Sequence, residues 1–341
     1  MRLLFITQKL HGQDAFGVLW IKAFQGRGYE VEVIVLEKKL EEAEHVLGKK
    51  GAVNFTVHSL GKETGAGKLS QIFRFWKLIR TLKYDRVFIH MSPVWGLLGA
   101  WYWIPKRTAV YLWYTHYKMQ AGLLLLGFYG KRLFCATEQS MPQYDNNPMK
   151  VVIGHGIDLS FWPKRENQCV DPYRLLGVFR LSRSKRLELC IRALTLLPPA
   201  YIWQIYGIEA EPDYVAEMKA LVRELGLESR VTFHGTAKLL DLPEIFSRHR
   251  LILNMASETI DKTMLEAMTC GCYPVTTARN AAAIGIPFAP AEDTPEAIAA
   301  FIQEYRELAP LQADEMYRIV AERHSLQTLI AKMDHYISTG Q

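Results

Sequence analysis

The sequence predicts an α/β protein made of two doubly wound domains, each a parallel sheet covered by helices. Short apolar runs alternate with helical patterns along the whole chain, and this alternation restarts once near the middle. A length of 341 residues is too large for one ordinary hydrophobic core and fits two domains of about 150 residues each. An apolar fraction of 49% and a charged fraction of 22% are typical of globular proteins.

The first half of the sequence contains candidate strands at 3–7, 31–36, 53–58, 86–90, 109–113 and 133–136 and helical patterns at 17–27, 69–82, 95–102 and 118–129. The stretch 87–105 has no charged residue and nearly the length needed to cross a bilayer. His90, Ser92, Pro93 and Pro105 interrupt it, however. We therefore expect a buried strand, a loop and a short helix there rather than a membrane span.

The second half repeats the pattern with strands at 175–179, 202–206, 231–234, 251–254 and 273–276 and helices at 185–197, 213–225, 262–269 and 294–306. Pro163 and the polar run 164–168 interrupt the periodicity and indicate a boundary. We expect one domain at residues 1–160 and a second at 161–322. A final helix within 323–341 is a candidate to pack back toward the first domain.

Charge is unevenly distributed along the chain. Residues 1–150 hold 21 Lys and Arg against 11 Asp and Glu, a net charge of +10, whereas the whole chain carries +6. A basic first domain favours an anionic partner, such as a membrane surface, a lipid phosphate or an acidic glycan. Nucleic acid is disfavoured because no zinc-finger, RNA-platform or basic-helix signature is present.

The five cysteines are odd in number and show no CxxC spacing, so we expect reduced thiols in the cytosol and no metal site. The apolar run at 3–6 is too short for a secretory signal. The sequence thus predicts a cytoplasmic protein, with the inner face of the membrane as a candidate peripheral location.

Two glutamates flank the start of the helix expected at 262–269, directly after a buried strand. Glu258 precedes that helix, Glu266 lies inside it, and Asp261 is a candidate amino-terminal cap. The amino end of a helix presents free N–H groups and a positive dipole end, which favour phosphate. Carboxylates beside it add acceptors for hydroxyl groups. This combination suits a ligand that is part anion and part polyol, such as a nucleotide sugar.

Two cations flank the corresponding turn at the start of the second domain. Arg180 follows the strand at 175–179, and Lys185 begins the next helical pattern. Both side chains are placed to converge on one anion with helix amides behind them. Basic residues at loop ends are often merely solvated, so the pair gains weight from the glutamates after the neighbouring strand.

The sequence resembles the retaining glycosyltransferase family 4, whose members have the two-domain GT-B fold. The resemblance follows the family's order along nearly the whole chain. It is carried by Leu3-Leu4-Phe5-Ile6-Thr7, Gly154-His155-Gly156-Ile157-Asp158, Arg180 with Lys185, Arg230-Val231-Thr232-Phe233-His234-Gly235, and Glu258 followed by Leu265-Glu266-Ala267-Met268.

The resemblance implies a role for each matching residue. Arg180 and Lys185 would neutralise the donor diphosphate, Glu266 would accept hydrogen bonds from the ribose, and Glu258 would hold the transferred sugar. His116 matches a histidine near that sugar. Further donor contacts would come from Gly12 and Gly17, which bracket a loop after the first strand, and from Leu265 and Thr263; the acceptor side would involve Asp14, His116 and His90.

Several positions depart from the family pattern. The loop 11–17 lacks an adjacent glycine pair, and Thr259-Ile260-Asp261 replaces the usual Gly-Phe-Gly after Glu258. Thr277-Ala278-Arg279-Asn280 replaces a frequent Gly-Gly-x-x-Glu turn. These changes bear on which donor fits. Structural alternatives also stay open, because Glu258 could cap the helix, Glu266 could lie on a surface, His116 could be a core histidine and Asp14 could form a turn.

The resemblance implies a metal-independent retaining transferase without a cofactor, moving a hexosyl unit from a UDP- or GDP-sugar to a glycan or lipid-linked acceptor, in surface polysaccharide or glycolipid assembly. An inverting transferase or a sugar-nucleotide epimerase on the same fold remains an alternative. A non-catalytic nucleotide-sugar or glycan-binding protein is another, since fold alone does not settle function. A dinucleotide oxidoreductase is disfavoured because no GxGxxG motif opens either domain.

Overall fold

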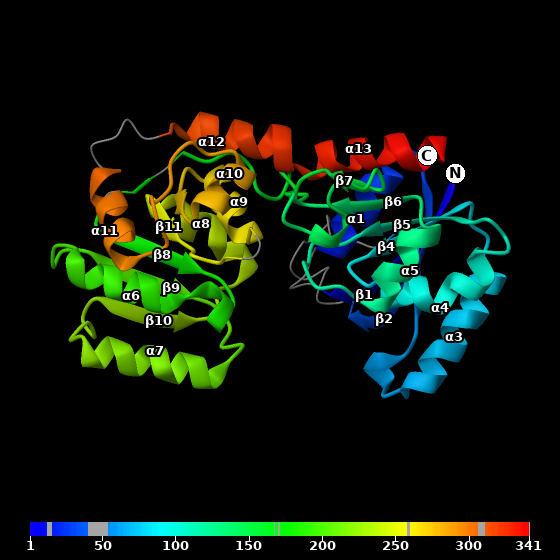
Figure 1. Ribbon diagram of the computed structural model, residues 1–341, viewed down its shortest axis with the longest axis horizontal. Helices are drawn as coiled ribbons and strands as arrows, with labels where there is room; N and C mark the ends of the chain where they lie inside the picture. The colour runs from blue at the N-terminus through cyan, green and yellow to red at the C-terminus, as the bar shows by residue number, and fades with distance from the viewer. Residues whose placement is uncertain are drawn as a thin grey trace. The chain divides into compact units, whose positions relative to one another are not determined.

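The computed structural model describes residues 1–11, 16–39, 54–166, 168–169, 171–257, 260–305 and 311–340. The chain forms two compact units, each with its own sheet (Figure 1). The first unit comprises Met1–Gly156 and Leu326–Gln341, and the second comprises Ile157–Ser325. Every strand pairing within the described residues is parallel, which confirms the predicted class of two α/β units.

The sheet of the first unit has the strand order β3-β2-β1-β4-β5-β6-β7. Its strands are β1 (Arg2–His11), β2 (Glu30–Lys39), β3 (Thr56–Ser59), β4 (Arg86–His90), β5 (Ala109–Trp113), β6 (Arg132–Cys135) and β7 (Lys150–Val152). The order reverses at β1 and β4, which are neighbours although two strands separate them in sequence. Ligands of open α/β sheets bind beyond the carboxyl ends of strands at such a reversal.

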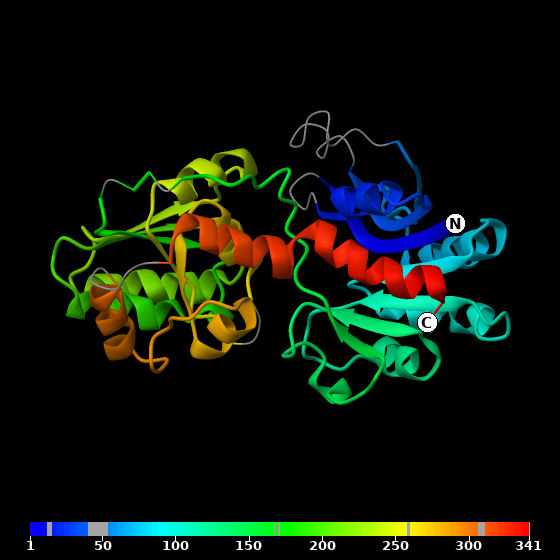
Figure 2. The same ribbon diagram turned by 90° about the horizontal axis from the view of Figure 1, so that it is seen from above.

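Helices cover both faces of this sheet, because successive side chains of a strand point to opposite sides. Leu4 and Ile6 belong to the core formed with α3, α4 and α5, whereas Phe5 packs on Phe24 of α1. The carboxyl-terminal helix α13 lies beside α1 (Figure 2). The helices of this unit are α1 (Phe16–Gln25), α3 (Lys68–Thr81), α4 (Val94–Trp103), α5 (Ala121–Tyr129) and α13 (Leu326–Thr339).

The second unit repeats the arrangement with the strand order β10-β9-β8-β11-β12. Its order reverses at β8 and β11, which are paired. The strands are β8 (Arg174–Val178), β9 (Ile202–Tyr206), β10 (Val231–Gly235), β11 (Leu251–Leu253) and β12 (Tyr273–Val275). The helices are α6 (Leu187–Leu196), α7 (Pro212–Glu224), α8 (Leu242–Ser247), α9 (Lys262–Thr269), α10 (Ala278–Ile284), α11 (Pro295–Glu304) and α12 (Ala313–Ile319).

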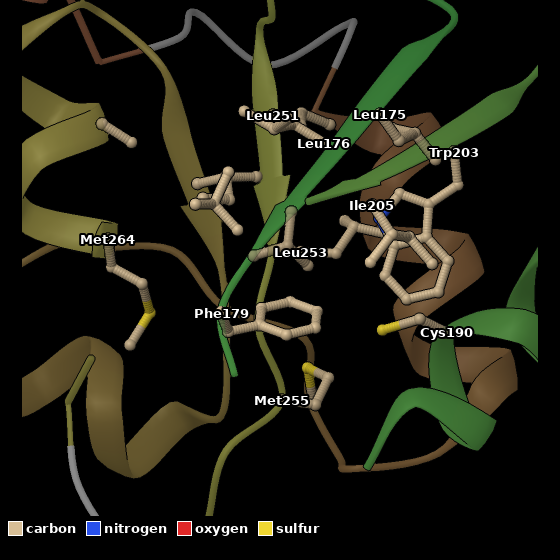
Figure 3. Close-up of a cluster of buried hydrophobic side chains, with 14 of the residues drawn as sticks. Leu175, Leu176, Phe179, Cys190, Trp203, Ile205, Leu251, Leu253, Met255 and Met264 are labelled. Carbon is tan, nitrogen blue, oxygen red and sulfur yellow. The ribbon is translucent and has the colours of Figure 1, made fainter. Parts of the chain in front are cut away.

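One hydrophobic core anchors the two chain segments that leave β8 and β11. Phe179 directly follows β8, Met255 follows β11, and Met264 belongs to α9 (Figure 3). All three side chains are buried in the same cluster as Leu253. Burying a side chain of this size stabilises the fold by roughly 1.5–3 kcal/mol. Both segments are therefore fixed where they emerge at the carboxyl edge of the sheet.

Most expected elements occur with boundaries moved by a few residues. The helix expected at 185–197 begins at Leu187, because a 3-10 turn at Arg183–Lys185 precedes it and Arg186 has a left-handed backbone with φ 50°. The helix expected at 118–129 begins at Ala121. The sequence analysis did not predict β7, α8, α10 or α12. Each of these elements is too short for its apolar residues to show a recognisable period.

The uncharged stretch 87–105 forms β4, a short connection and α4, as expected. No helix among the described residues has both the length and the apolar character to cross a bilayer. All five cysteines are free, and four of them are buried. Burial raises the pKa of the Cys190 thiol to about 12, so this thiol is unreactive at neutral pH.

Candidate functional site

Arg180 and Lys185 follow β8, and Glu266 follows β11, the neighbouring strand in the sheet of the second unit. The segment 179–186 leads from β8 to α6, and the segment 254–261 leads from β11 to α9. Because β8 and β11 are paired and parallel, both segments leave the sheet at the same edge. The structure thus places the two sequence motifs at the strand-order reversal, where a ligand site is expected in this kind of sheet.

Lys185 is held in place by an ion pair across these two segments. Its Nζ lies 2.7 Å from Oδ1 of Asp261, and the two side chains are only 12% and 21% exposed. Oδ2 of Asp261 accepts a second hydrogen bond, at 2.7 Å, from Nδ2 of Asn254. The ammonium group is therefore fixed beside the start of α9 rather than free in solvent.

Asp261 does not act as the predicted cap. It occupies the position before α9 with extended backbone, but its side chain accepts no hydrogen bond from the amides of that helix. Both carboxylate oxygens are used by Lys185 and Asn254 instead. The prediction failed because a charged partner from the neighbouring loop binds the carboxylate more strongly than a backbone amide does. Asp261 thus leaves the amino end of α9 uncapped.

Arg180, unlike the largely buried Lys185, is exposed. It directly follows the buried Phe179. It makes no hydrogen bond or ion pair with any residue that the structure describes. Arg183, three residues on, differs because it forms an exposed ion pair with Glu217. Arg180 is therefore a cation at the strand-order reversal that has not been neutralised by the described residues.

Glu266 is buried within the first two turns of α9. Its side chain is 3% exposed and makes no hydrogen bond or ion pair with the described part of the chain. Burial raises the pKa of its carboxyl from 4.5 to about 7, with the positive charge of Lys262 lowering it and the negative charge of Asp261 raising it. A buried carboxyl without a hydrogen-bond partner is costly to folding, so its retention needs an explanation.

Thr263 and Leu265, two predicted donor contacts on α9, differ in what surrounds their side chains. Oγ1 of Thr263 is buried without a partner among the described residues, three positions before Glu266 and hence on the same side of α9. Leu265 is completely buried in the hydrophobic core of the second unit. Any contact of Leu265 with a ligand would therefore have to come from its backbone.

The structure shows contacts for two residues to which the sequence analysis assigned no role. Arg186 donates from Nε to the carbonyl of Met255, at 2.7 Å, and pairs with Asp293 at 2.8 Å. Asn280 is fully buried and donates from Nδ2 to the carbonyl of Ala256, at 2.5 Å. Both hold the segment after β11. Thr277, which caps α10 by accepting from the amide of Asn280, is the sequence signal that locates this turn.

The remaining predicted residues either belong to the first unit or lie outside the described residues. Glu258, Gly12 and Asp14 lie outside them. Gly17 is buried in the first turn of α1, and a Cβ there would lie 3.1 Å from Leu10.

His90 and His116 lie at or just beyond the carboxyl ends of β4 and β5, which are neighbouring strands of the first sheet. His90 ends β4, with Nδ1 at 3.4 Å from Oγ1 of Thr7, and its ring lies against that of Trp20. His116 is exposed beyond β5 and contacts the ring of Tyr114. His116 is therefore not a buried core histidine.

No group of three or more His, Cys, Asp and Glu side chains suited to a metal ion occurs in the described ranges. Metal independence remains a prediction from the sequence.

Comparisons with known proteins concern the family and the fold. Residues 160–283 match the family described as glycosyl transferases group 1. No curated protein matches the sequence. Similar solved structures include HepE of Anabaena in complex with UDP and glucose, at 19% identity and a TM-score of 0.77, with 99% of this chain and 100% of that chain covered.

Two further structures are similar over almost their whole length. Sucrose-phosphate synthase from Thermosynechococcus elongatus shares 15% identity at a TM-score of 0.73, with 99% and 98% of the two chains covered. A variant of S. aureus TarM, in complex with fondaparinux, alpha-GlcNAc-glycerol and UDP, shares 10% identity at a TM-score of 0.74, with 98% and 99% covered. The chain thus has the GT-B fold of these proteins, and its residues 160–283 match the group 1 glycosyl transferases.

Proposed function

We propose that this protein is a glycosyltransferase that takes a hexosyl unit from a nucleotide diphospho-sugar bound at the strand-order reversal of the second unit. The arrangement around α9 carries the proposal. Among the described residues, a fixed ammonium group, a helix start that the side chain of Asp261 does not cap, and a buried hydroxyl and a buried carboxyl without partners lie within a few residues of α9's first turn. A ligand that is part diphosphate and part polyol provides a partner for each of them.

The cations act on the leaving group. Cleavage of the bond between sugar and phosphate places negative charge on the diphosphate, and preorganised positive groups stabilise this charge more than they stabilise the ground state. Lys185 is preorganised by its ion pair, and Arg180 supplies a positive charge that the described residues leave unpaired. The amino end of α9 adds a positive dipole end behind them.

The acidic residues recognise the nucleoside and the sugar. Glu266, in its ionised form, accepts hydrogen bonds from the ribose hydroxyls, and this interaction offsets the cost of burying a carboxylate that has no partner among the described residues. Glu258 holds hydroxyls of the transferred sugar. The Oγ1 atom of Thr263 donates to a phosphate oxygen. Gly12, Gly17 and the backbone of Leu265 complete the donor contacts.

UDP is the nucleotide that the comparisons favour. The similar Anabaena structure holds UDP and glucose, and the S. aureus structure holds UDP with glycans. We propose a UDP-sugar as donor ahead of a GDP-sugar, and transfer with retention and without a metal ion. The acceptor is a glycan or a lipid-linked sugar in surface polysaccharide or glycolipid assembly. It binds the basic first unit with His116, His90 and Asp14, at the cytoplasmic face of a membrane.

A panel of UDP-, GDP-, ADP- and dTDP-sugars in a thermal-shift experiment tests the donor site, since a ligand at 100 times its Kd stabilises the folded protein by about 2.7 kcal/mol. We expect a shift with UDP-sugars that is lost in Glu266→Ala, although this variant still folds. If no nucleotide sugar shifts the transition, the proposal is wrong. Transfer to an added acceptor, with anomeric analysis of the product, then separates a retaining transferase from an inverting one and from a non-catalytic binder.

A further inference from the structure

Three neighbouring helices of the first unit carry large apolar side chains on their outer side. On α4, the exposed Val94, Leu97 and Trp101 recur at intervals of three and four residues, while Trp95 and Trp103 are buried on the opposite side. This helix is therefore apolar on both sides. One side is explained by the core of the unit, and the other requires a different explanation.

The same pattern continues on α5 and α3. Leu124 and Phe128 are exposed on α5, and Phe128 is 80% exposed. On α3, Leu69 and Phe73 are exposed, and Phe73 is 63% exposed. Figure 1 shows the three helices together at one side of the first unit. We call their exposed side chains, with those of Ile104 after α4, the outer helical face.

Hydrogen bonds fix these helices to one another, so the outer helical face is rigid. Nε1 of Trp76 on α3 donates to the carbonyl of Leu98 on α4, at 2.8 Å. The hydroxyl of Tyr129 on α5 donates to the carbonyl of Gly96 on α4, at 2.7 Å. A Cβ on Gly96 would lie 2.6 Å from Leu126, so glycine allows α4 and α5 to approach closely.

A chain of aromatic rings crosses from α3 to α4. The ring of Trp76 lies 5.7 Å from that of Phe73 and 5.9 Å from that of Trp101, which in turn lies 5.7 Å from Tyr102. Nζ of Lys106 donates to the hydroxyl of Tyr102 at 2.8 Å. Indole and phenol rings with a nearby ammonium group are the side chains that settle at the boundary between lipid headgroups and acyl chains.

The charge of this region has one sign. Residues 64–137 contain 11 Lys and Arg and a single acidic residue, Asp85, which already pairs with Arg2. The exposed cations include Lys68, Arg74, Lys77 and Arg80 of α3 and Lys106, Arg107 and Lys131 near the ends of α4 and α5. Apolar side chains surrounded by positive charges match the surface of a bilayer, in which anionic headgroups lie over apolar acyl chains.

We infer that the outer helical face docks on a membrane containing anionic phospholipids, with Phe73, Trp101 and Phe128 inserted among the lipids and the cations of α3 against the headgroups. A second copy of this chain would bring two positive faces together, which disfavours it as the occupant. Docking through the outer helical face would hold the protein at the membrane, as the proposed function requires. This docking does not depend on which nucleotide sugar is the donor.

Vesicle flotation tests this inference directly, using phosphatidylcholine vesicles with and without phosphatidylglycerol. We expect the protein to float with the anionic vesicles and to be released by salt. The combined change Phe73→Ser, Trp101→Ser and Phe128→Ser lowers the partition coefficient at least about tenfold, since each inserted ring contributes on the order of 1 kcal/mol or more. Lys77→Glu with Arg80→Glu lowers it by a similar factor, because each juxtamembrane cation contributes about 1 kcal/mol.

Matched variants in the second unit serve as controls. Ile208→Ser with Leu240→Ser removes exposed apolar side chains, and Arg192→Glu with Arg223→Glu reverses exposed charges, without touching the outer helical face. Both controls should float like the wild type. Failure of the wild type to bind anionic vesicles, or full binding by the triple serine variant, would overturn the inference.

Analytical ultracentrifugation tests whether a second copy of the chain covers the outer helical face instead of a membrane. A dimer of the wild type that is absent in the triple serine variant would assign this face to a second copy and contradict the membrane inference. Donor-induced thermal shifts should be the same in the triple serine variant and the wild type. Loss of vesicle binding is thereby separated from failure of the proposed function.

Discussion

Nζ of Lys185 lies 2.7 Å from Oδ1 of Asp261, so the cation expected to receive a diphosphate is already paired with a carboxylate. Asp261 thus places a negative charge directly before the start of α9. The pair fixes the ammonium group, but it also opposes the approach of an anionic ligand.

Replacing Asp261 by Asn should tighten donor binding. The amide keeps the size of the side chain and one oxygen for Lys185, while it removes the charge that repels the diphosphate. We expect the Kd for UDP to fall about tenfold, equivalent to about 1.4 kcal/mol, as measured by calorimetry at fixed ionic strength. Asp171→Asn is the control, because it removes a carboxylate paired with Arg174 at the other end of β8. Weaker binding in Asp261→Asn would instead show that the ion pair positions Lys185 for the ligand.

Removing both cations at the turn after β8 should abolish most of the catalysis. Contacts that stabilise charge in a transition state contribute roughly 3 kcal/mol each, so Arg180→Ala with Lys185→Ala should lower kcat by several orders of magnitude. Arg183→Ala is the matched control in the same turn, because its side chain pairs with Glu217 in solvent. A double variant with near-normal turnover would rule out the proposed electrostatic mechanism, whereas reduced turnover in the control would indicate a general loss of charge.

The burial of Glu266 should make stability depend on pH. Its pKa is raised from 4.5 to about 7 in the folded protein, so the folded state holds a proton that the unfolded state releases between these values. The free energy of unfolding should therefore fall by about 3 kcal/mol as pH rises from 4.5 to 7, and then level off. Glu266→Gln should remove this fall, and urea denaturation at several pH values measures it. Parallel pH profiles for the two proteins would contradict the assignment.

The same carboxyl should link donor binding to proton release. Ribose hydroxyls donate to the ionised carboxylate, so binding lowers the pKa of Glu266, and the affinity for a UDP-sugar should rise as pH increases through about 7. The diphosphate diester of a nucleotide sugar does not titrate in this range. Calorimetry in two buffers with different ionisation enthalpies should show the released proton in the wild type and not in Glu266→Gln. Equal proton release in both would place the titrating group elsewhere.

The hydroxyl of Thr263, which has no partner among the described residues, should contribute more to ligand affinity than to the stability of the protein without ligand. Thr263→Val keeps the shape and removes a buried Oγ1 that lacks a partner among the described residues, so stability without ligand should stay equal or rise by about 1 kcal/mol. Donor affinity should fall roughly five- to tenfold, in proportion to one lost hydrogen bond. Thr269→Val is the control, since that hydroxyl donates to the carbonyl of Glu266 within α9. Unchanged donor affinity in Thr263→Val would exclude the contact.

Much of this architecture could be predicted from residue patterns. Apolar runs such as 3–7 and 251–254 became β1 and β11, because a strand buried on both sides needs apolar residues at every position. The order of the strands could not be predicted, since it depends on which runs pair over long distances. Asp261 shows the same limit at a single residue. Its position before α9 predicts a cap, but Lys185, 76 residues earlier, binds its side chain instead.

The sequence by itself determined the parallel α/β units and the residue types available for a donor site, because periodicity and helix-start chemistry act over a few neighbouring residues. Only the tertiary structure decided that Lys185 pairs with Asp261, that Glu266 is buried without a hydrogen-bond partner among the described residues, and that Phe73, Trp101 and Phe128 remain exposed. These outcomes depend on contacts between segments far apart in the chain. Burial and pairing set the charge states and the accessible surfaces on which the proposed chemistry and the membrane contact rest.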